Sequence, residues 1–326
     1  MTQLYRWLEE LWWTRRPPAP LRLLSVVYGA ISRRHLRQRA SHTLQSKLPL
    51  ISVGNITAGG SGKTPFVIWL AKALAERGRS PVILCRGDGG NAQSPRLVQA
   101  ADKASDVGDE ARLLFELAGC PVISGRNRIK GSELAAEYGD VAILDDGFQY
   151  RHLERCCDIV LVPAEGVGNG FGIPAGPLRE PLAALGRADL IVRTGRGDAV
   201  PLQKQKPEWR WRLHPAGLSD IMHSGSDAPA ICLAATGIAR PQRFLDDLQS
   251  AGLVILESRL YPDHHRFDET DAQAILATGQ PVVVTGKDAV KLKPLWPAGT
   301  PLWVLQQQPD EAADLLENIL SRLPDA

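Results

Sequence analysis

The sequence lacks the patterns that mark several common classes of protein. Its 326 residues include only five cysteines, and none of them forms a CxxC pair. The seven histidines show no HExxH or other zinc-binding spacing, so a structural zinc site is not expected. Because three of the cysteines lie in or near apolar runs, we interpret the cysteines as free thiols in or near the core of a protein in a reducing cytoplasm.

Long hydrophobic segments are also missing near the N-terminus. The apolar stretch at residues 23–31 is too short to cross a bilayer, which needs about 20 residues. It has no small-x-small cleavage site, and arginines follow it, so a secretory signal is not expected either. The composition, with 44% apolar and 23% charged residues, is that of an ordinary folded protein.

Basic and apolar residues gather at the N-terminus, although the whole chain carries a net charge of only +2. The first fifty residues contain nine basic side chains and two acidic ones, so an acidic partner would meet this part first. Five apolar residues recur there at helical spacing: Leu4, Trp7, Leu8, Leu11 and Trp12. Tryptophans on one face with arginines nearby favour a helix lying in the head-group region of an anionic leaflet. The alternative is a pair of helices that packs on the protein.

A glycine-rich turn at residues 55–65 is the most informative segment. It follows an apolar run that predicts a strand, and it opens a helical pattern at 66–77. In this context the turn predicts a phosphate site, formed by main-chain N–H groups and the positive end of the helix. We expect Lys63 to reach the β- and γ-phosphates and the Thr64 hydroxyl to ligate Mg²⁺. The residues expected to line the site are Thr57, Ala58, Gly59, Gly60, Ser61, Gly62, Lys63 and Thr64.

Two positions of this turn depart from other phosphate loops. Thr57 stands where the first glycine is usual, and Ala58 stands where one large class of ATPases carries a second lysine that reaches across a dimer. The second departure argues against that class. A glycine-rich turn with an incidental Gly-Lys-Thr is the remaining alternative.

Acidic residues stand at the boundaries of two further predicted elements. The apolar run 141–144 ends in Asp145 and Asp146, and a carboxylate there can hold Mg²⁺ or its waters opposite Thr64. Paired acids at a strand end could instead cap a helix. Asp109 begins a helical pattern; the pattern alone favours a cap, whereas the functional interpretation is a base that accepts a proton from a hydroxyl.

Two irregular segments carry further candidate residues. The Pro- and Gly-rich stretch 174–181 predicts an ordered loop, in which Arg179 could bind a phosphate or simply lie on the surface. The stretch 261–267 brings together a carboxylate, two imidazoles and a guanidinium. A histidine of this stretch beside Asp109 could orient it and tune its pKa, or the stretch could be a solvated loop.

Apolar runs that alternate with amphipathic stretches predict an α/β fold with a parallel sheet covered on both faces. The runs are 81–85, 121–124, 141–144, 158–162 and 189–192. We expect a P-loop NTPase-like core with a second, smaller α/β domain and an N-terminal membrane-associating helix. The expected divisions are 1–40 for the helical segment, 41–200 for the core and 201–326 for the smaller domain, with the last helix a candidate to return to the core.

The order of these motifs closely resembles the tetraacyldisaccharide 4'-kinase family of lipid A biosynthesis. The resemblance runs from about residue 23 to about residue 322. It rests on seven segments: 54–65, Arg-Gly-x-Gly-Gly at 86–90, Val-Gly-Asp-Glu at 107–110, Asp-Asp-Gly-Phe-Gln at 145–149, Pro-Ala-Gly-Pro-Leu-Arg-Glu-Pro at 174–181, Asp-His at 263–264 and Lys-Asp-Ala-Val-Lys-Leu at 287–292.

The resemblance implies that ATP and Mg²⁺ are used to phosphorylate the 4'-hydroxyl of a tetraacyldisaccharide 1-phosphate, which gives lipid IVA. It also implies a peripheral position on the cytoplasmic face of the inner membrane and a site between two unequal domains. No nucleic acid and no obligate protein partner are expected. Carried over by motif, Asp109 is the base with His264 as its partner, and this replaces the interpretation of Asp109 as a cap. Asp145 and Asp146 become metal-site acids, and Arg179 and Glu180 active-site loop residues.

Three positions depart from the family pattern: Asp88 stands in place of Tyr, Ala111 in place of Pro and Gly286 in place of Glu. They bear on rate and substrate preference rather than on the reaction. Two other functions remain open at this point. One is a nucleotide-hydrolysing switch whose helix recruits a partner, and the other is a kinase of a soluble small molecule.

Overall fold

The computed structural model describes residues 10–13, 16–195, 197, 199–202, 206–263, 265–310 and 312–324, without the side chain of Arg37. The chain divides into two compact units. The larger unit holds the described residues up to Arg212 and those from 312 onward, and the smaller unit holds Leu213–Asp310.

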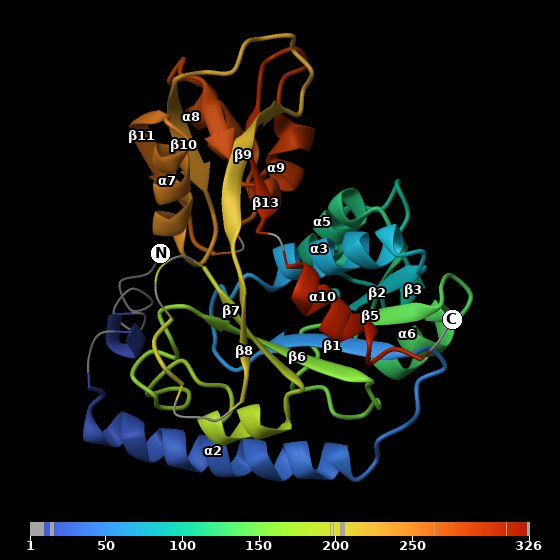
Figure 1. Ribbon diagram of the computed structural model, residues 1–326. Helices are drawn as coiled ribbons and strands as arrows, with labels where there is room; N and C mark the ends of the chain where they lie inside the picture. Colours follow the sequence, from blue (N-terminus) through green and yellow to red (C-terminus); the bar gives the residue numbers. More distant parts are fainter. Residues whose placement is uncertain are drawn as a thin grey trace. The chain divides into compact units, whose positions relative to one another are not determined.

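The larger unit is built around an eight-stranded sheet with the strand order β3-β4-β2-β5-β1-β6-β7-β8 (Figure 1). Neighbouring strands are parallel, except that β3 runs antiparallel to β4. The strands are β1 (Leu50–Asn55), β2 (Pro81–Cys85), β3 (Arg96–Leu97), β4 (Val122–Ser124), β5 (Val141–Asp145), β6 (Cys157–Pro163), β7 (Leu190–Thr194) and β8 (Glu208–Trp211).

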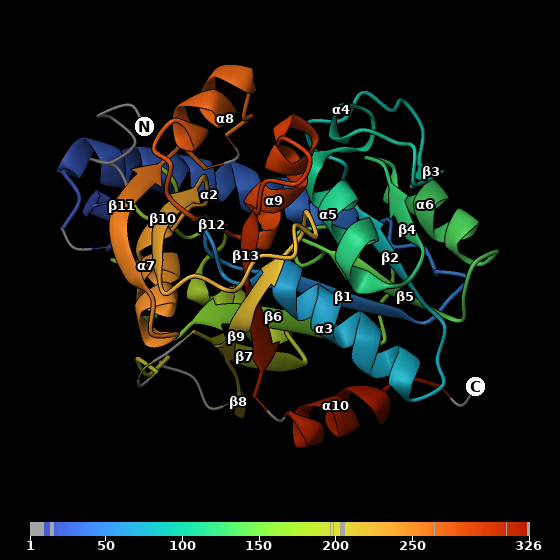
Figure 2. The ribbon, with the colours of Figure 1, turned by 90° about the horizontal axis from the view of Figure 1, so that it is seen from above.

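The central strands β1, β2, β5 and β6 are buried along their whole lengths. Strands of this kind need cover on both faces, and α3 and α5 lie on one side of the sheet while α2 runs along the other (Figures 1 and 2). The helices are α2 (Ala19–Ala40), α3 (Lys63–Glu76), α4 (Ala104–Val107), α5 (Asp109–Ala118), α6 (Arg128–Ala135), the 3₁₀ helix η1 (Leu182–Arg187) and α10 (Ala313–Leu320). The predicted α/β class with a parallel core sheet is confirmed.

The smaller unit has its own five-stranded sheet, with the order β11-β10-β12-β13-β9. Only β9 runs antiparallel to its neighbour. Its elements are β9 (Leu213–Asp220), β10 (Ile231–Thr236), α7 (Pro241–Ser250), β11 (Val254–Leu260), α8 (Glu269–Leu276), β12 (Val282–Val284), α9 (Gly286–Leu292), the 3₁₀ helix η2 (Lys293–Leu295) and β13 (Trp303–Pro309). Apolar clusters that include Val282 and Val283 fill the core of this unit.

The segment near the N-terminus is attached to the larger unit by specific contacts. Leu11 is buried, and the indole Nε1 of Trp12 donates a hydrogen bond to the carbonyl oxygen of Pro174 at 2.9 Å. These two residues therefore pack on the protein, whereas Leu4, Trp7 and Leu8 lie outside the described residues.

Helix α2 is fixed differently. The Ser25 hydroxyl donates to the carbonyl oxygen of Gly172 at 2.9 Å, and Leu36 is buried. In the same helix, large apolar side chains are more than half exposed, among them Leu23, Leu24, Val26, Val27 and Ile31. No helix in the described part of the chain combines the length and hydropathy that a membrane span requires.

Candidate active site

The glycine-rich turn joins the end of β1 to the first residue of α3. Gly59 and Gly62 have φ angles of 97° and 78°, which L side chains rarely adopt, so the turn depends on glycine at these positions. Lys63 is the first residue of the helix. The free N–H groups of this first turn and the positive end of the helix create a site suited to phosphate oxygens.

Hydrogen bonds from neighbouring elements hold the turn in place. Asn55 Nδ2 donates to Ser61 Oγ at 2.8 Å, and the Thr194 hydroxyl at the end of β7 donates to the Ser61 carbonyl oxygen at 2.8 Å. The Ala58 amide donates to the Pro177 carbonyl oxygen at 2.7 Å, so this N–H is already engaged within the protein. The loop predicted at 174–181 is thus bound directly to the turn.

Lys63, Asp146 and Arg179 meet beside the turn. Lys63 Nζ lies 3.3 Å from Asp146 Oδ1, and Arg179 Nη1 lies 3.0 Å from each carboxylate oxygen of Asp146. Burial alone would raise the pKa of Asp146, but the two cations outweigh it and hold this pKa well below its usual range. The structure therefore brings together three residues that the sequence assigned to separate motifs.

Asp145 has a different environment although it is the next residue in the chain. It ends β5 and is only 3% exposed, and its Oδ1 accepts a hydrogen bond from the Asp146 amide at 3.0 Å. Burial and then the nearby Glu110 raise its pKa from 3.8 to about 7. Arg128 does not pair with this carboxylate, because its guanidinium donates to the main-chain carbonyl oxygens of Asp145 and Asp146.

Asp109 is the first residue of α5 and is half-buried. The preceding Gly108 has a φ of 95°, and a Cβ added to it would lie 2.8 Å from the Asp88 carbonyl oxygen. Its backbone therefore packs directly against the 86–90 segment that follows β2. Since β2, β5 and β1 are adjacent parallel strands, the segments after them emerge at the same edge of the sheet.

Glu180 is buried and is held by polar side chains that also support the turn. It is 6% exposed, pairs with Arg187 at 2.6 Å and accepts a hydrogen bond from Gln149 Nε2 at 3.2 Å. The same Gln149 amide donates to the Asn55 carbonyl oxygen at 2.9 Å. Arg179 and Glu180, adjacent in the chain, thus have separate tasks: one contacts Asp146, and the other holds the loop.

His264 lies outside the described residues, so its predicted pairing with Asp109 stays a prediction. Its neighbours in the smaller unit are engaged locally. Lys287 Nζ lies 3.2 Å from Asp263 Oδ1, and a ring nitrogen of His265 lies 2.7 Å from an oxygen of Asp271.

Sequence reasoning missed four residues that the structure places around the site: Asn55, Glu110, Arg128 and Gln149. Three of them stand inside motifs named from the sequence, which is the one signal that could have indicated them: Asn55 in 55–65, Glu110 in 107–110 and Gln149 in 145–149. Arg128 carried no such signal.

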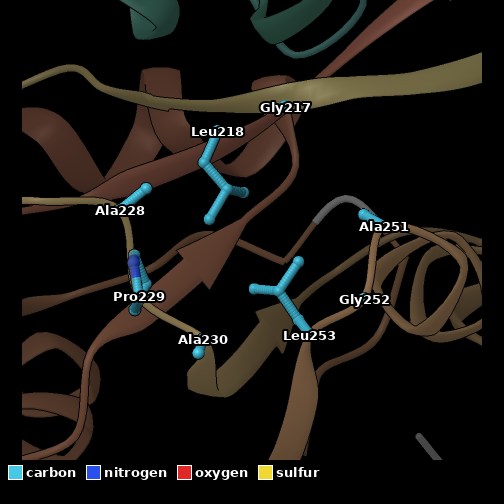
Figure 3. A pocket seen from close by; sticks show the side chains of 8 residues that line it. All are labelled: Gly217, Leu218, Ala228, Pro229, Ala230, Ala251, Gly252 and Leu253. Atoms are coloured by element: carbon cyan, nitrogen blue, oxygen red, sulfur yellow. The ribbon is translucent and has the colours of Figure 1, made fainter.

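A pocket of about 300 Å³ in the smaller unit is lined only by small and apolar residues, with Leu218 and Leu253 pointing into it (Figure 3), and it contains none of the predicted site residues.

In the described part of the chain, no cluster of three or more His, Cys, Asp or Glu side chains could hold a metal ion. Mg²⁺ in nucleotide sites needs fewer protein ligands, because substrate phosphates and waters supply the others. Two groups fit a cation of that type: the hydroxyl of Thr64 and the buried carboxyl group of Asp145. Arg128 forms no ion pair with that carboxyl group.

The site has the features of a P-loop nucleotide-binding protein. A buried parallel strand leads into a turn with left-handed glycines, and a lysine begins the helix that follows. Acidic residues stand at the end of the neighbouring strand. The family model described as tetraacyldisaccharide-1-P 4'-kinase matches residues 18–324. The chain belongs to this family, which makes it a lipid kinase of lipid A biosynthesis. The family and the activity expected from the sequence are confirmed.

Individual relatives agree with this assignment. The tetraacyldisaccharide 4'-kinase of Dechloromonas aromatica is 36% identical, over 98% of both chains. The enzyme of that name from Azoarcus sp. is 37% identical, over 96% of this chain and 94% of its own. Among solved structures, that of LpxK from Aquifex aeolicus in complex with ATP matches with a TM-score of 0.75 and 26% identity, over 94% of this chain and 99% of that one.

Proposed function

We propose that the chain transfers the γ-phosphoryl group of ATP to the 4'-hydroxyl of a tetraacyldisaccharide 1-phosphate and so produces lipid IVA. One observation carries the proposal: Lys63 and Arg179 converge on Asp146 beside the glycine turn. Two cations gathered at a phosphate-binding turn suit the stabilisation of charge on a transferring phosphoryl group. The solved relative in complex with ATP supports ATP as the donor.

The turn at residues 59–64 holds the nucleotide phosphates in this proposal. Its N–H groups and the helix N-terminus favour anions, and Lys63 adds a full positive charge. A phosphate tail would compete with Asp146 for Lys63 and Arg179, because both cations lie within ion-pair distance of that carboxylate. The resting contacts therefore keep the cations in place until nucleotide binds.

Thr64 and Asp145 are the residues that would hold Mg²⁺, with Asp146 engaged instead by Lys63 and Arg179. The ion would neutralise charge on the β- and γ-phosphates. Asp145 is favoured over Asp146 because its buried carboxyl group receives less compensation from nearby cations, as its raised pKa indicates.

Asp109 is the proposed base for the 4'-hydroxyl, and His264 the residue that orients it. Asp109 lies in the first turn of α5, at the positive end of the helix dipole. Loss of a general base costs about a hundredfold to ten-thousandfold in rate.

The exposed apolar face of α2 supports a peripheral position on an anionic membrane surface, which we assign to the cytoplasmic face of the inner membrane. Leu23, Leu24, Val26, Val27 and Ile31 offer apolar area, and Arg33 and Arg34 follow within one turn of the helix. The acyl chains of the substrate would then stay in the bilayer while the sugar reaches the site.

The test is to incubate the protein with labelled ATP and the lipid A precursor in mixed micelles and to look for a new phosphorylated lipid. Asp109→Ala should lower turnover at least a hundredfold and leave ATP binding nearly intact. Glu116→Gln on the same helix is the matched control, since Glu116 pairs with Arg112 away from the turn, and it should keep wild-type turnover.

Three results would contradict the proposal. ATP hydrolysis without a phosphorylated lipid would favour a nucleotide-driven switch. Phosphorylation of a soluble sugar with equal efficiency would favour a small-molecule kinase. Full turnover in Asp109→Ala would remove this carboxylate from the mechanism.

A further inference from the structure

Asn169 lies at the centre of an irregular stretch that follows β6. Its amide donates a hydrogen bond to the Trp12 carbonyl oxygen at 2.7 Å. Its side-chain Nδ2 donates to the carbonyl oxygens of Leu11 at 3.0 Å and Ala175 at 2.9 Å, and its Oδ1 accepts from the Phe171 amide at 3.1 Å. This residue therefore ties the segment near the N-terminus to two separate points of the stretch.

The same stretch, the clamp loop (residues 168–178), packs tightly around Asn169. A Cβ added to Gly176 would collide with Asn169 Oδ1, and a Cβ added to Gly168 would collide with the Trp12 carbonyl oxygen. Gly168 also has a φ of 69°, a conformation that L side chains rarely adopt. The backbone of the clamp loop therefore has little freedom to move while Asn169 keeps its hydrogen bonds.

The end of the clamp loop is bonded to the segment that leads into the glycine-rich turn. The Ala58 amide donates to the Pro177 carbonyl oxygen, and the Arg179 amide donates to the Ile56 carbonyl oxygen, both at 2.7 Å. Arg179 is also the residue whose guanidinium contacts Asp146. A displacement of the clamp loop would therefore move the start of the turn and this guanidinium together.

We propose that Asn169 is a positioning residue of the nucleotide site, and that Leu11 and Trp12 belong to the scaffold that holds the glycine-rich turn. Asn169 acts through Pro177 and Arg179 and does not itself contact the nucleotide. The inference deepens the proposed function, because it assumes that the turn binds the phosphates of ATP; it does not depend on the acceptor. Hydrogen bonds from main-chain N–H groups to phosphate weaken when the backbone turns away from the ligand.

Equilibrium binding of ATP, measured by calorimetry without lipid, tests the inference. Asn169→Asp keeps the shape of the side chain and removes both Nδ2 donors. It should raise the Kd for ATP about tenfold. Ser25→Ala removes a milder restraint, the bond from α2 to the Gly172 carbonyl oxygen, and should raise this Kd about threefold. Asn318→Asp on α10 is the matched control, because its oxygen still accepts from Arg322; its Kd should stay within about twofold of wild type.

Steady-state kinetics separate positioning from a general loss of folded protein. Asn169→Asp should raise the KM for ATP and leave the KM for the lipid acceptor within about twofold of wild type. Partial unfolding would instead lower kcat through the fraction of active molecules and leave the Kd for ATP of the folded molecules unchanged.

Vesicle binding separates this role from membrane attachment. Asn169→Asp does not alter the exposed apolar residues of α2, so its sedimentation with anionic vesicles should stay within about twofold of wild type. Val26→Glu changes that exposed face and should show the reverse, which is weaker sedimentation with an unchanged Kd for ATP.

Two outcomes would overturn the inference. One is a wild-type Kd for ATP in Asn169→Asp, or in Ser25→Ala if Asn169→Asp does not fold. The other is an equal rise of this Kd in Asn318→Asp. Wild-type protein that binds ATP but produces no phosphorylated lipid would contradict the proposed function alone, because ATP binding by the Asn169 variant would still decide the inference.

Discussion

Asp145 provides the sharpest test of the site, because its burial has a measurable cost. The side chain is 3% exposed at the end of β5, and burial together with Glu110 raises its pKa from 3.8 to about 7. A pKa raised on folding means that the folded state binds the proton more tightly than the unfolded state. Ionisation of Asp145 above pH 7 therefore destabilises the nucleotide-free protein, by at most about 4 kcal/mol.

The sign of the effect sets the pH window. The stabilisation from the protonated carboxyl group is complete below pH 3.8 and is lost as the pH rises to about 7. Asp145→Asn removes the charge and keeps an oxygen that can accept the Asp146 amide. The variant should gain up to about 4 kcal/mol of unfolding free energy at pH 8 but less than about 2 kcal/mol at pH 5.

Urea unfolding of the nucleotide-free protein at the two pH values measures both gains. Glu137→Gln is the control, because Glu137 is an exposed carboxylate, and its unfolding free energy should stay within about 0.5 kcal/mol of wild type. An equal gain for Asp145→Asn at pH 5 and pH 8, or no gain at all, would refute the reasoning. Added ATP and Mg²⁺ should stabilise wild type more than the variant, since the variant loses a proposed ligand of the ion.

Three further predictions test other parts of the argument. Lys63→Ala should lower kcat at least a hundredfold in the lipid phosphorylation assay, and wild-type turnover would exclude this lysine from charge stabilisation. Gly54→Ala should cost about 3 kcal/mol or more in urea unfolding, because its Cβ would lie 2.5 Å from the Cβ of Phe148; unchanged stability would contradict this packing. Val26→Glu should weaken sedimentation with anionic vesicles about tenfold or more, with Leu117→Glu on α5 as the control; equal losses in both variants would argue against a role for α2.

The sheet and the phosphate turn were predictable because their signals are local. A strand buried on both faces must be a continuous apolar run, and the run predicted at 81–85 is β2 itself. The turn is defined by glycines next to a lysine, and only the first helical residue differs, Lys63 instead of 66. Strand β8 was not predicted, because its residues alternate between exposed and buried in a short edge position.

The contacts that tune the site were not predictable, because they join residues far apart in the chain. Gln149 and Glu180 are bonded across 31 residues, and Arg128 reaches the Asp145 carbonyl oxygen across 17. No periodicity records such pairs. Trp12 shows that sequence periodicity also does not identify what an apolar helix face contacts. Such a face has the same pattern whether it meets lipid or protein, and Trp12 contacts the loop at Pro174.

The two adjacent acids show why geometry was needed to separate their roles. In sequence Asp145 and Asp146 are equivalent carboxylates at a strand end. Asp145 keeps the strand conformation and stays buried, whereas Asp146 turns into the left-handed region with a φ of 50°. That turn brings Asp146 to Lys63 and Arg179, which lower its pKa, while burial raises the pKa of Asp145. The Asp146 carboxylate is thus neutralised by cations of the protein itself, whereas burial favours the protonated form of Asp145, and a cation bound beside Asp145 would favour its ionised form.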